Sequence, residues 1–268
     1  MFDLAKLYES ALVAQIEHHT EIDSTSSRAL VLAADAAVQM PLLVLANQQS
    51  AGRGRGSNQW WASRGALTFS LVVDTSAYAI AMQQWPQLSL VTGLALSEAL
   101  EPLAPRAQFS LKWPNDVYAA NHKLGGILIE AVPSQKSRLV IGIGLNINNS
   151  LAAAPEEIRQ RAVSLFDLLE NSASPPFDLT AILLSLLGSL DQHYRQLSQQ
   201  GFASLLPDWR SRCFLTGKQI TIQTGPQSSS SPQITGLCHG LSDDGSLLFS
   251  TASGVQSVVA GSVSCWEG

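Results

Sequence analysis

The sequence reads KWPND from Lys112 to Asp116 and KLGGILIE from Lys123 to Glu130. Proline favours an extended conformation in the residue before it, so Pro114 holds Trp113 extended and brings the last two residues of its motif to the rim of a pocket. Apolar residues surround both motifs at the spacing of short strands. The two motifs therefore predict a sheet whose connecting turns carry functional side chains.

Strand and helix patterns extend outward from these motifs. Short apolar runs of strand length occur at residues 16–22, 42–46, 67–73, 109–113, 117–118, 123–132 and 138–147. Helical spacing occurs at residues 3–14 and at 87–100, 164–170 and 178–199, the last capped by Asp178 or Thr180. Another helix is expected to begin at the capping candidates Ser24, Thr25 and Ser26. Runs at 219–224, 233–238, 246–249 and 255–259 are typical of a small β-barrel, with the low-complexity segment 225–232 at a hairpin tip. These patterns predict an α+β chain with a small all-β part at its C-terminal end.

Further functional candidates lie upstream, in the segment QSAGRGRGSNQWW at residues 49–61. Its glycines allow the backbone to approach a ligand closely, and Arg53 and Arg55 supply planar donors for phosphate or carboxylate. The glycine spacing matches neither a P-loop nor a dinucleotide-binding loop. On its own, the segment fits a small-molecule anion site, a solvated loop or an RGG-like contact to nucleic acid.

Composition limits these alternatives. The 268 residues, 46% of them hydrophobic, suffice for one large domain or for a large and a small one. A net charge of −5 argues against a general binder of nucleic acid or anionic membranes, so any polyanion site would be local. No apolar stretch is long enough to span a bilayer, and the N-terminus lacks the basic region of a secretion signal. We therefore expect a cytoplasmic protein without a membrane partner.

Cysteine and histidine are not arranged as metal ligands. Cys213, Cys238 and Cys265 are far apart and include no CxxC pair, which favours reduced thiols over disulfides or zinc. The histidines form no HExxH or comparable group, so the sequence predicts no catalytic zinc.

Taken in order, Ser24-Thr25, GRGRG, KWPND, KLGGILIE and GIGLNIN (residues 142–148) resemble the motifs of the biotin protein ligases. The resemblance extends from about Glu21 to the C-terminus. It implies ATP-dependent activation of biotin to biotinyl-5′-AMP, followed by transfer of biotin to a lysine of a biotin carboxyl carrier domain. It also implies a mixed β-sheet flanked by helices, of the class II synthetase-like type, in residues 1–212, and an SH3-like β-barrel in residues 213–268.

The resemblance bears on partners as well. Many bacterial members of the family carry an N-terminal winged helix-turn-helix that binds an operator, and Ser24-Thr25 lie too near Met1 to leave room for one. We therefore expect an enzyme that does not double as a repressor and has no DNA partner. A homodimer is possible, and the sequence leaves both the oligomeric state and the identity of the carrier open.

For biotin, the resemblance implies a site for the polar ureido group, built from hydroxyls and an amide that supply donors and acceptors. Ser24 and Thr25 can act there and cap a helix at the same time. Relatives commonly have Asn at the position of Ser26, so no contact is assigned to that residue. The implied substrate-binding residues are Ser24, Thr25, Gln49, Gly52, Arg53, Gly125 and Gly126.

Adenylation brings two anions together, because the biotin carboxylate attacks the α-phosphate of ATP. The site therefore needs cations aimed at the developing charge. The resemblance implies Arg55, Lys112 and Lys123 as catalytic cations. It gives Asp116 a catalytic role in which the carboxylate either holds Mg²⁺ or orients the acceptor lysine.

For the nucleotide, the resemblance implies an aromatic platform and polar contacts. Trp60 or its neighbour Trp61 would stack on adenine. Asn146 would read the adenine edge, since an amide can pair with adenine through two hydrogen bonds. The implied nucleotide-binding residues are Arg53, Arg55, Trp60, Asn115 and Asn146.

Three other functions were weighed against biotin transfer. A lipoate or octanoate ligase or transferase shares the fold but is not expected to combine GRGRG, KWPND and KLGG. A regulator that senses biotin without transferring it would give no ATP–pyrophosphate exchange. An RGG-type RNA-binding module predicts salt-dependent polynucleotide binding, which the acidic composition disfavours.

Overall fold

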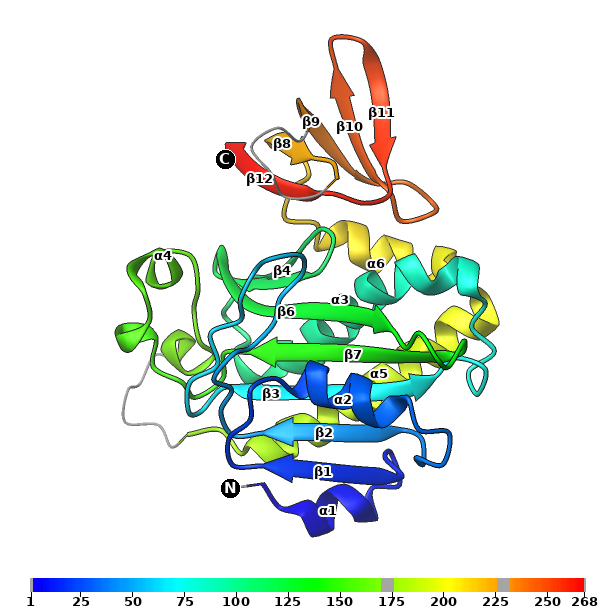
Figure 1. The fold of residues 1–268 in the computed structure, drawn as a ribbon. Coiled ribbons are helices and arrows are strands. Elements are labelled where there is room, and N and C mark those ends of the chain that lie inside the picture. Colours follow the sequence, from blue (N-terminus) through cyan, green and yellow to red (C-terminus); the bar gives the residue numbers. More distant parts are fainter. Residues whose placement is uncertain (1, 170–175, 226–231, 268) are drawn as a thin grey trace.

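A mixed β-sheet forms the centre of the molecule (Figure 1). The computed structural model describes residues 2–169, 176–225 and 232–267, with the backbone alone at 264–267. The seven strands follow the order β1-β2-β3-β7-β6-β5-β4; β1 and β2 are parallel, and all other neighbours are antiparallel. Their bounds are β1 (Gln15–His19), β2 (Leu42–Ala46), β3 (Leu67–Asp74), β4 (Phe109–Lys112), β5 (Asp116–Ala119), β6 (His122–Ala131) and β7 (Arg138–Leu145).

Helices cover both faces of this sheet. On one face, α2 (Thr25–Ala33) packs against β2, β3 and β7. On the other, α3 (Trp85–Leu100) contacts β4, β5 and β6 and packs along α5 (Leu179–Gln200). Successive residues of β2 alternate between the two cores, Leu42 and Val44 with α2, Leu43 and Leu45 with the larger core. This two-sided burial explains why β2 is apolar at every position.

Helix caps agree with the sequence patterns. The Ser24 hydroxyl accepts a hydrogen bond from the Ser27 amide at 3.4 Å, and the Asp178 carboxylate accepts one from the Thr180 amide at 2.8 Å. Both capping predictions are confirmed. The remaining helices are α1 (Leu4–Glu9), α4 (Glu156–Arg159) and α6 (Leu206–Ser211). Among the described residues, no helix is both long and apolar enough to cross a membrane.

The helix predicted at 164–170 is wrong over its described part, which holds only a 3₁₀ turn at Phe166–Leu168. Ser164 and Asp167 close this turn through reciprocal hydrogen bonds of 3.1 and 3.2 Å between side chains and backbone amides. This reciprocal arrangement is a capping box, which starts a helical turn, and the turn ends at Leu169, whose backbone is extended. Glu170 itself lies outside the described residues.

Five C-terminal strands form a second, antiparallel sheet in the order β11-β10-β9-β8-β12. Its apolar residues belong to the same core as α3 and α5. The Trp113 indole donates a hydrogen bond to the Gly245 carbonyl at 3.3 Å, which ties the KWPND motif to this sheet. The predicted fold class is thus confirmed, whereas residues 226–231 of the expected hairpin tip lie outside the description. The bounds are β8 (Gln219–Gln223), β9 (Gln233–Leu241), β10 (Leu247–Thr251), β11 (Gly254–Val258) and β12 (Ser262–Glu267).

Candidate functional site

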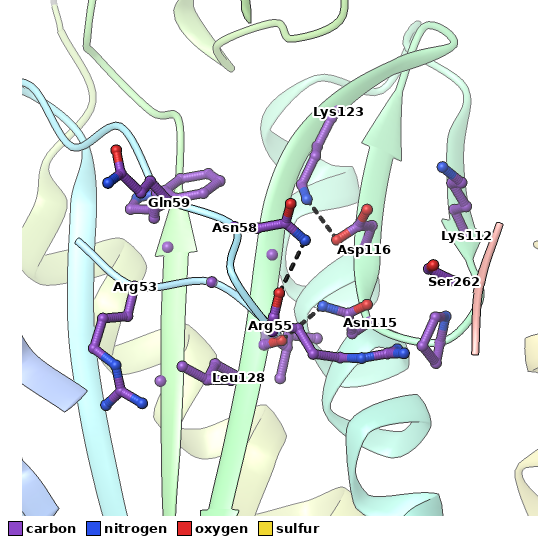
Figure 2. A pocket seen from close by; sticks show the side chains of 18 of the residues that line it. Arg53, Arg55, Asn58, Gln59, Lys112, Asn115, Asp116, Lys123, Leu128 and Ser262 are labelled. Carbon is purple, nitrogen blue, oxygen red and sulfur yellow. Dashed lines mark hydrogen bonds and ion pairs between the residues drawn. The ribbon is translucent and has the colours of Figure 1, made fainter. Parts of the chain in front are cut away.

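A cavity of about 930 Å³ lies beneath the glycine-rich loop, over β7, β6 and β5 (Figure 2). Its lining comes from segments far apart in the chain, including the start of α2, the turn between β4 and β5, and the C-terminal sheet. Most of the residues predicted for the site line this one cavity. They are Ser24, Thr25, Gln49, Arg53, Arg55, Trp60, Lys112, Asn115, Asp116, Lys123 and Gly126.

One end of the cavity holds a hydroxyl–amide cluster, formed by the lining residues Thr25, Ser26 and Gln49 together with Ser70; Gln49 is half-buried and the other three are buried. The Gln49 carbonyl oxygen accepts from the Thr25 amide at 2.7 Å and from the Thr25 hydroxyl at 3.0 Å. The Ser70 hydroxyl donates to Thr25 Oγ1 at 2.9 Å and lies 3.1 Å from the Ser26 hydroxyl. The bonds fix the orientation of each group, so the cluster is a preorganised set of donors and acceptors for a polar ligand.

The other end holds a cation cluster, formed by Lys112, Lys123 and Arg55 around Asp116. Lys112 is paired with Asp116 across β4 and β5. The Lys123 ammonium lies 2.6 Å from Asp116 Oδ1, with 32% of the lysine side chain and 16% of the aspartate side chain exposed. A single carboxylate thus faces several cations. The surplus positive charge suits an anionic ligand with more than one charge.

Burial lowers the pKa of two groups in the cation cluster, Lys112 and Arg55. It is the main cause that lowers the pKa of Lys112 to about 8, and the charges of Lys123 and Arg161 act in the same direction while Asp116 opposes them. Burial also lowers the pKa of the Arg55 guanidinium, again opposed by Asp116. Because desolvation disfavours these cations, a bound anion would recover part of that cost.

The glycine-rich loop is a short hairpin with two arginines that point in different directions (Figure 2). The Trp60 amide donates to the Gly52 carbonyl at 2.9 Å, and the Gly54 amide donates to the Asn58 carbonyl at 2.8 Å. The Arg53 side chain pairs with Glu130 on β6. The Arg55 side chain donates to the Gly261 carbonyl, just before β12. The loop therefore connects the central sheet with the C-terminal sheet over the cavity.

Trp60 packs directly on the floor of the cavity. A Cβ atom on Gly144 would lie 2.4 Å from Trp60 Cε2, so only glycine allows the indole this close to β7. Trp60 lines the cavity, and Trp61 is not among its lining residues. The indole is thus in place to stack against a planar ligand.

Three predicted residues are not among those that line the cavity: Gly52, Gly125 and Asn146. A Cβ on Gly52 would lie 2.4 Å from the Trp60 carbonyl, and one on Gly125 would lie 2.4 Å from Leu145 Cδ2, so both glycines serve close packing. Asn146 is buried and accepts a hydrogen bond from the Asn149 amide at 3.0 Å. Their roles in binding stay predictions.

Asn115 lines the cavity but already has a structural task. Its side-chain amide donates to the Ile127 carbonyl at 2.9 Å, and its own carbonyl accepts from the Ile127 amide at 2.9 Å. These bonds hold the KWPND turn against β6. The side-chain groups left for a nucleotide are the carbonyl oxygen and the second N–H of the amide.

Sequence reasoning missed several lining residues, because no local motif marks them. Arg161 reaches the cavity through a parallel bridge between Ala162 and Lys123. Others come from the loop tip, the β5–β6 turn, the end of α4 and the C-terminal sheet, which only the tertiary fold brings together. They are Asn58, Gln59, Asn121, His122, Gln160, Gln223, Ser262 and Val263.

Comparison with known proteins points to one family. The model of the Biotin/lipoate A/B protein ligase family matches residues 21–148. A biotin–[acetyl-CoA-carboxylase] ligase of Mycobacterium tuberculosis is 32% identical over 252 residues, which cover 93% of this chain and 88% of the relative. One of Paracoccus denitrificans is 31% identical over 90% of this chain and 96% of its own length. The structure of the Aquifex aeolicus biotin protein ligase with biotin and ATP superposes with a TM-score of 0.76, at 30% identity over 93% of this chain and 97% of that one.

Proposed function

This chain belongs to the biotin protein ligases, and we propose that it activates biotin with ATP and transfers it to a lysine of a biotin carboxyl carrier domain. The observation that carries the proposal is the pairing, in one cavity, of a hydroxyl–amide cluster with a cation cluster. Biotin has a polar ureido ring at one end and a carboxylate at the other. The two ends of the cavity are complementary to the two ends of biotin.

The hydroxyl–amide cluster selects for the ureido group. Thr25, Ser26 and Ser70 are almost fully buried. A dithiolane or an alkyl chain, as in lipoate or octanoate, would displace water from these groups without replacing its hydrogen bonds, and unpaired buried polar groups are costly. Biotin is therefore the substrate that fits this end of the cavity.

The cation cluster then serves adenylation. A carboxylate oxygen of biotin attacks the α-phosphorus of ATP, the bond to the bridging oxygen breaks, and pyrophosphate leaves. Lys123 and Arg55 stabilise the charge that develops on the carboxylate and the phosphate. Asp116 orients Lys123 through their 2.6 Å ion pair.

Asp116 is the single carboxylate among the described lining residues. Mg²⁺ in nucleotide sites is commonly held by one or two carboxylates together with phosphate oxygens, so this residue fits the ion. Bound Mg²⁺ would neutralise phosphate charge. In the second step Asp116 orients the acceptor lysine, whose neutral amine attacks the acyl carbon of biotinyl-5′-AMP; the bond from this carbon to the phosphate oxygen breaks, AMP leaves with the electron pair, and the nitrogen gives its proton to solvent.

We assign the catalytic unit to residues 1–212 and the barrel to residues 213–268. Support for this division comes from the second sheet, which begins at β8. Ser262 and Val263 line the cavity, so the barrel completes the site rather than standing apart from it.

Biotin-dependent exchange of labelled pyrophosphate into ATP tests the proposal. Exchange should require biotin and should be absent with lipoate or octanoate in its place. Exchange that is equal with all three acids would overturn the assignment of the hydroxyl–amide cluster to the ureido group.

A further inference from the structure

One cation at the rim of the cavity, Arg161, belongs to neither the hydroxyl–amide cluster nor the cation cluster. Arg161 follows α4, is exposed, and lines the cavity. Within the part of the chain that the structure describes, its guanidinium has no hydrogen-bond or ion-pair partner. Arginine forms two parallel hydrogen bonds with phosphate, so a ligand can supply the missing partner.

The backbone fixes Arg161 beside the cation cluster. The Lys123 amide donates to the Arg161 carbonyl at 2.8 Å, and the Val163 amide donates to the Lys123 carbonyl at 3.0 Å. Through this bridge, a residue distant in sequence is held next to the start of β6. Its positive charge is close enough to help lower the pKa of Lys112.

The order of the strands determines how the two clusters are arranged along the cavity. Thr25, Ser26 and Ser70 of the hydroxyl–amide cluster lie on α2 and β3, whereas Lys112, Asp116 and Lys123 lie on β4, β5 and β6, and β7 separates the two groups. A biotin with its ring in the first cluster has its carboxylate directed toward Lys123. ATP then meets this carboxylate at the cation cluster, beside which Arg161 is held by the bridge to Lys123.

Charge balance indicates which phosphates Arg161 meets. Lys112, Lys123, Arg55 and Arg161 carry four positive charges against one negative charge on Asp116. Biotinyl-5′-AMP carries one negative charge on its phosphate, which Lys123 and Arg55 can match. Only ATP, or pyrophosphate with biotinyl-5′-AMP, brings enough negative charge for the remaining cations.

We infer that Arg161 binds the β- and γ-phosphates of ATP and holds the pyrophosphate as it leaves. The inference rests on the proposed ligase function. An exposed position at the rim suits a group that must release its ligand after each turnover. Lys112, which is less exposed than Arg161 and lines the same cavity, shares these phosphates.

The test compares Arg161→Ala with Arg159→Ala. Arg159 is an exposed arginine two residues upstream that is not among the lining residues. Three reactions are measured with the full chain: adenylation with varied ATP, the reverse reaction of biotinyl-5′-AMP with varied pyrophosphate, and transfer from supplied biotinyl-5′-AMP to a carrier domain. The third reaction involves no pyrophosphate.

Arg161→Ala should raise the KM for ATP and the KM for pyrophosphate by roughly tenfold each, the effect of losing one charge-assisted contact. Transfer from supplied biotinyl-5′-AMP should be unchanged, Arg161→Lys should recover part of the loss, and Arg159→Ala should behave as the parent. Unchanged KM values would overturn the inference. A higher KM for the carrier alone would also overturn it and would assign Arg161 to carrier docking. If the parent gives no biotin-dependent exchange, the proposed function fails instead.

Discussion

At the scale of single residues, Lys123 is the cation whose geometry is best defined. Its ammonium is held 2.6 Å from Asp116 Oδ1, and its backbone is bonded on both sides to the segment after α4. A lysine fixed in this way can stabilise a transition state without reorganising.

Lys123→Ala should lower the rate of adenylation by roughly 10²–10³-fold, the usual cost of one preorganised electrostatic contact. Binding of biotin should weaken far less, because the ureido ring is held by a separate cluster. Pyrophosphate exchange and calorimetric titration with biotin measure the two effects. Normal exchange in the variant would remove Lys123 from the reacting centre.

Lys112 should give adenylation a pH dependence. With a pKa lowered to about 8 by burial, this lysine is charged below that pH and neutral above it. The value of kcat/KM for ATP should therefore fall as the pH rises through about 8. In Lys112→Arg the cation persists, so the fall should move to higher pH. Identical pH profiles in the parent and the variant would show that Lys112 does not cause this fall of kcat/KM for ATP.

At the scale of elements, the glycine-rich loop is anchored at its two arginines. Its residues 50–59 are mostly exposed and contribute no large apolar side chain to the core. Arg53 holds the loop to β6 through Glu130, and Arg55 holds it to the start of β12 through the Gly261 carbonyl. A loop kept by few contacts can open and close at low cost.

Arg55→Gly should keep some adenylation but release biotinyl-5′-AMP. The intermediate is a reactive mixed anhydride, and the variant loses both its phosphate contact and the tether to Gly261. Released intermediate should label lysines of added albumin, and free amine should suppress this labelling. A variant that forms the adenylate yet labels only the carrier would show that another residue retains it.

The strands of the central sheet could be predicted from the sequence, whereas the position of Arg161 at the rim of the cavity could not. Strands around KWPND and KLGG were predicted to within one or two residues, because alternating apolar runs and Pro114 mark them locally. The prediction of a helix at 164–170 was wrong. The short turn closed by Ser164 and Asp167 has the same local residue pattern as the start of a longer helix. Arg161 has no local signal, since its position depends on a bridge to Lys123.

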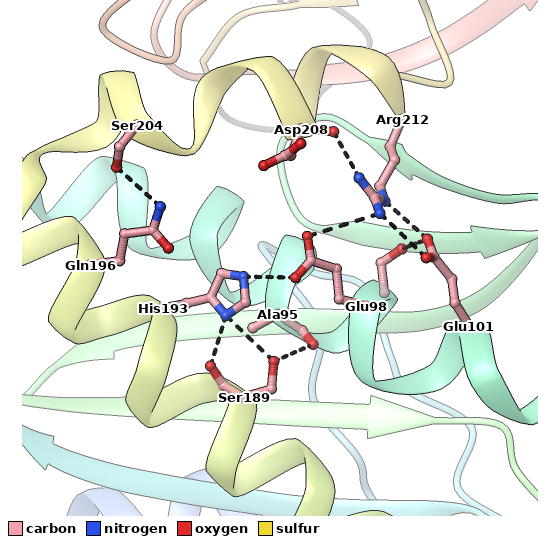
Figure 3. A network of polar contacts seen from close by, with 10 residues as sticks. Ala95, Glu98, Glu101, Ser189, His193, Gln196, Ser204, Asp208 and Arg212 are labelled. Atoms are coloured by element: carbon pink, nitrogen blue, oxygen red, sulfur yellow. Dashed lines mark hydrogen bonds and ion pairs between the residues drawn. The ribbon is translucent and has the colours of Figure 1, made fainter.

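At the scale of the whole molecule, a polar network joins three helices away from the cavity (Figure 3). His193 on α5 is buried, with Nε2 3.1 Å from the Glu98 carboxylate on α3 and Nδ1 2.8 Å from the Ser189 carbonyl. Arg212, at the end of α6, pairs with Glu101 at 2.9 Å. The network supports the helices on which the C-terminal sheet rests.

Glu98→Ala should lower the free energy of unfolding by about 1–3 kcal/mol, because it leaves the buried His193 without its carboxylate partner. The kcat of the folded enzyme should not change, since the network does not line the cavity. Lys6→Ala is a matched control, because its ion pair with Asp3 is exposed and should contribute under about 1 kcal/mol. Urea unfolding measures all three proteins. Equal stability of Glu98→Ala and the parent would contradict the structural role.

The barrel is the part of the site that the sequence could not place. Its strands β8 to β11 were predicted from turn spacing, but β12 was not, and the contribution of Ser262 and Val263 to the cavity depends on docking through Trp113 and the shared core. Contacts between segments more than a hundred residues apart carry no periodicity that a sequence pattern can reveal.

The mass of a carrier domain, incubated with the full chain, biotin, ATP and Mg²⁺, decides whether this protein transfers biotin. The mass should rise by one biotinyl group on a single lysine, and the gain should require ATP and disappear when that lysine is replaced by arginine. An unchanged mass under conditions in which biotin-dependent pyrophosphate exchange proceeds would contradict transfer. An unchanged mass without exchange would contradict the assignment of the cavity to biotin and ATP.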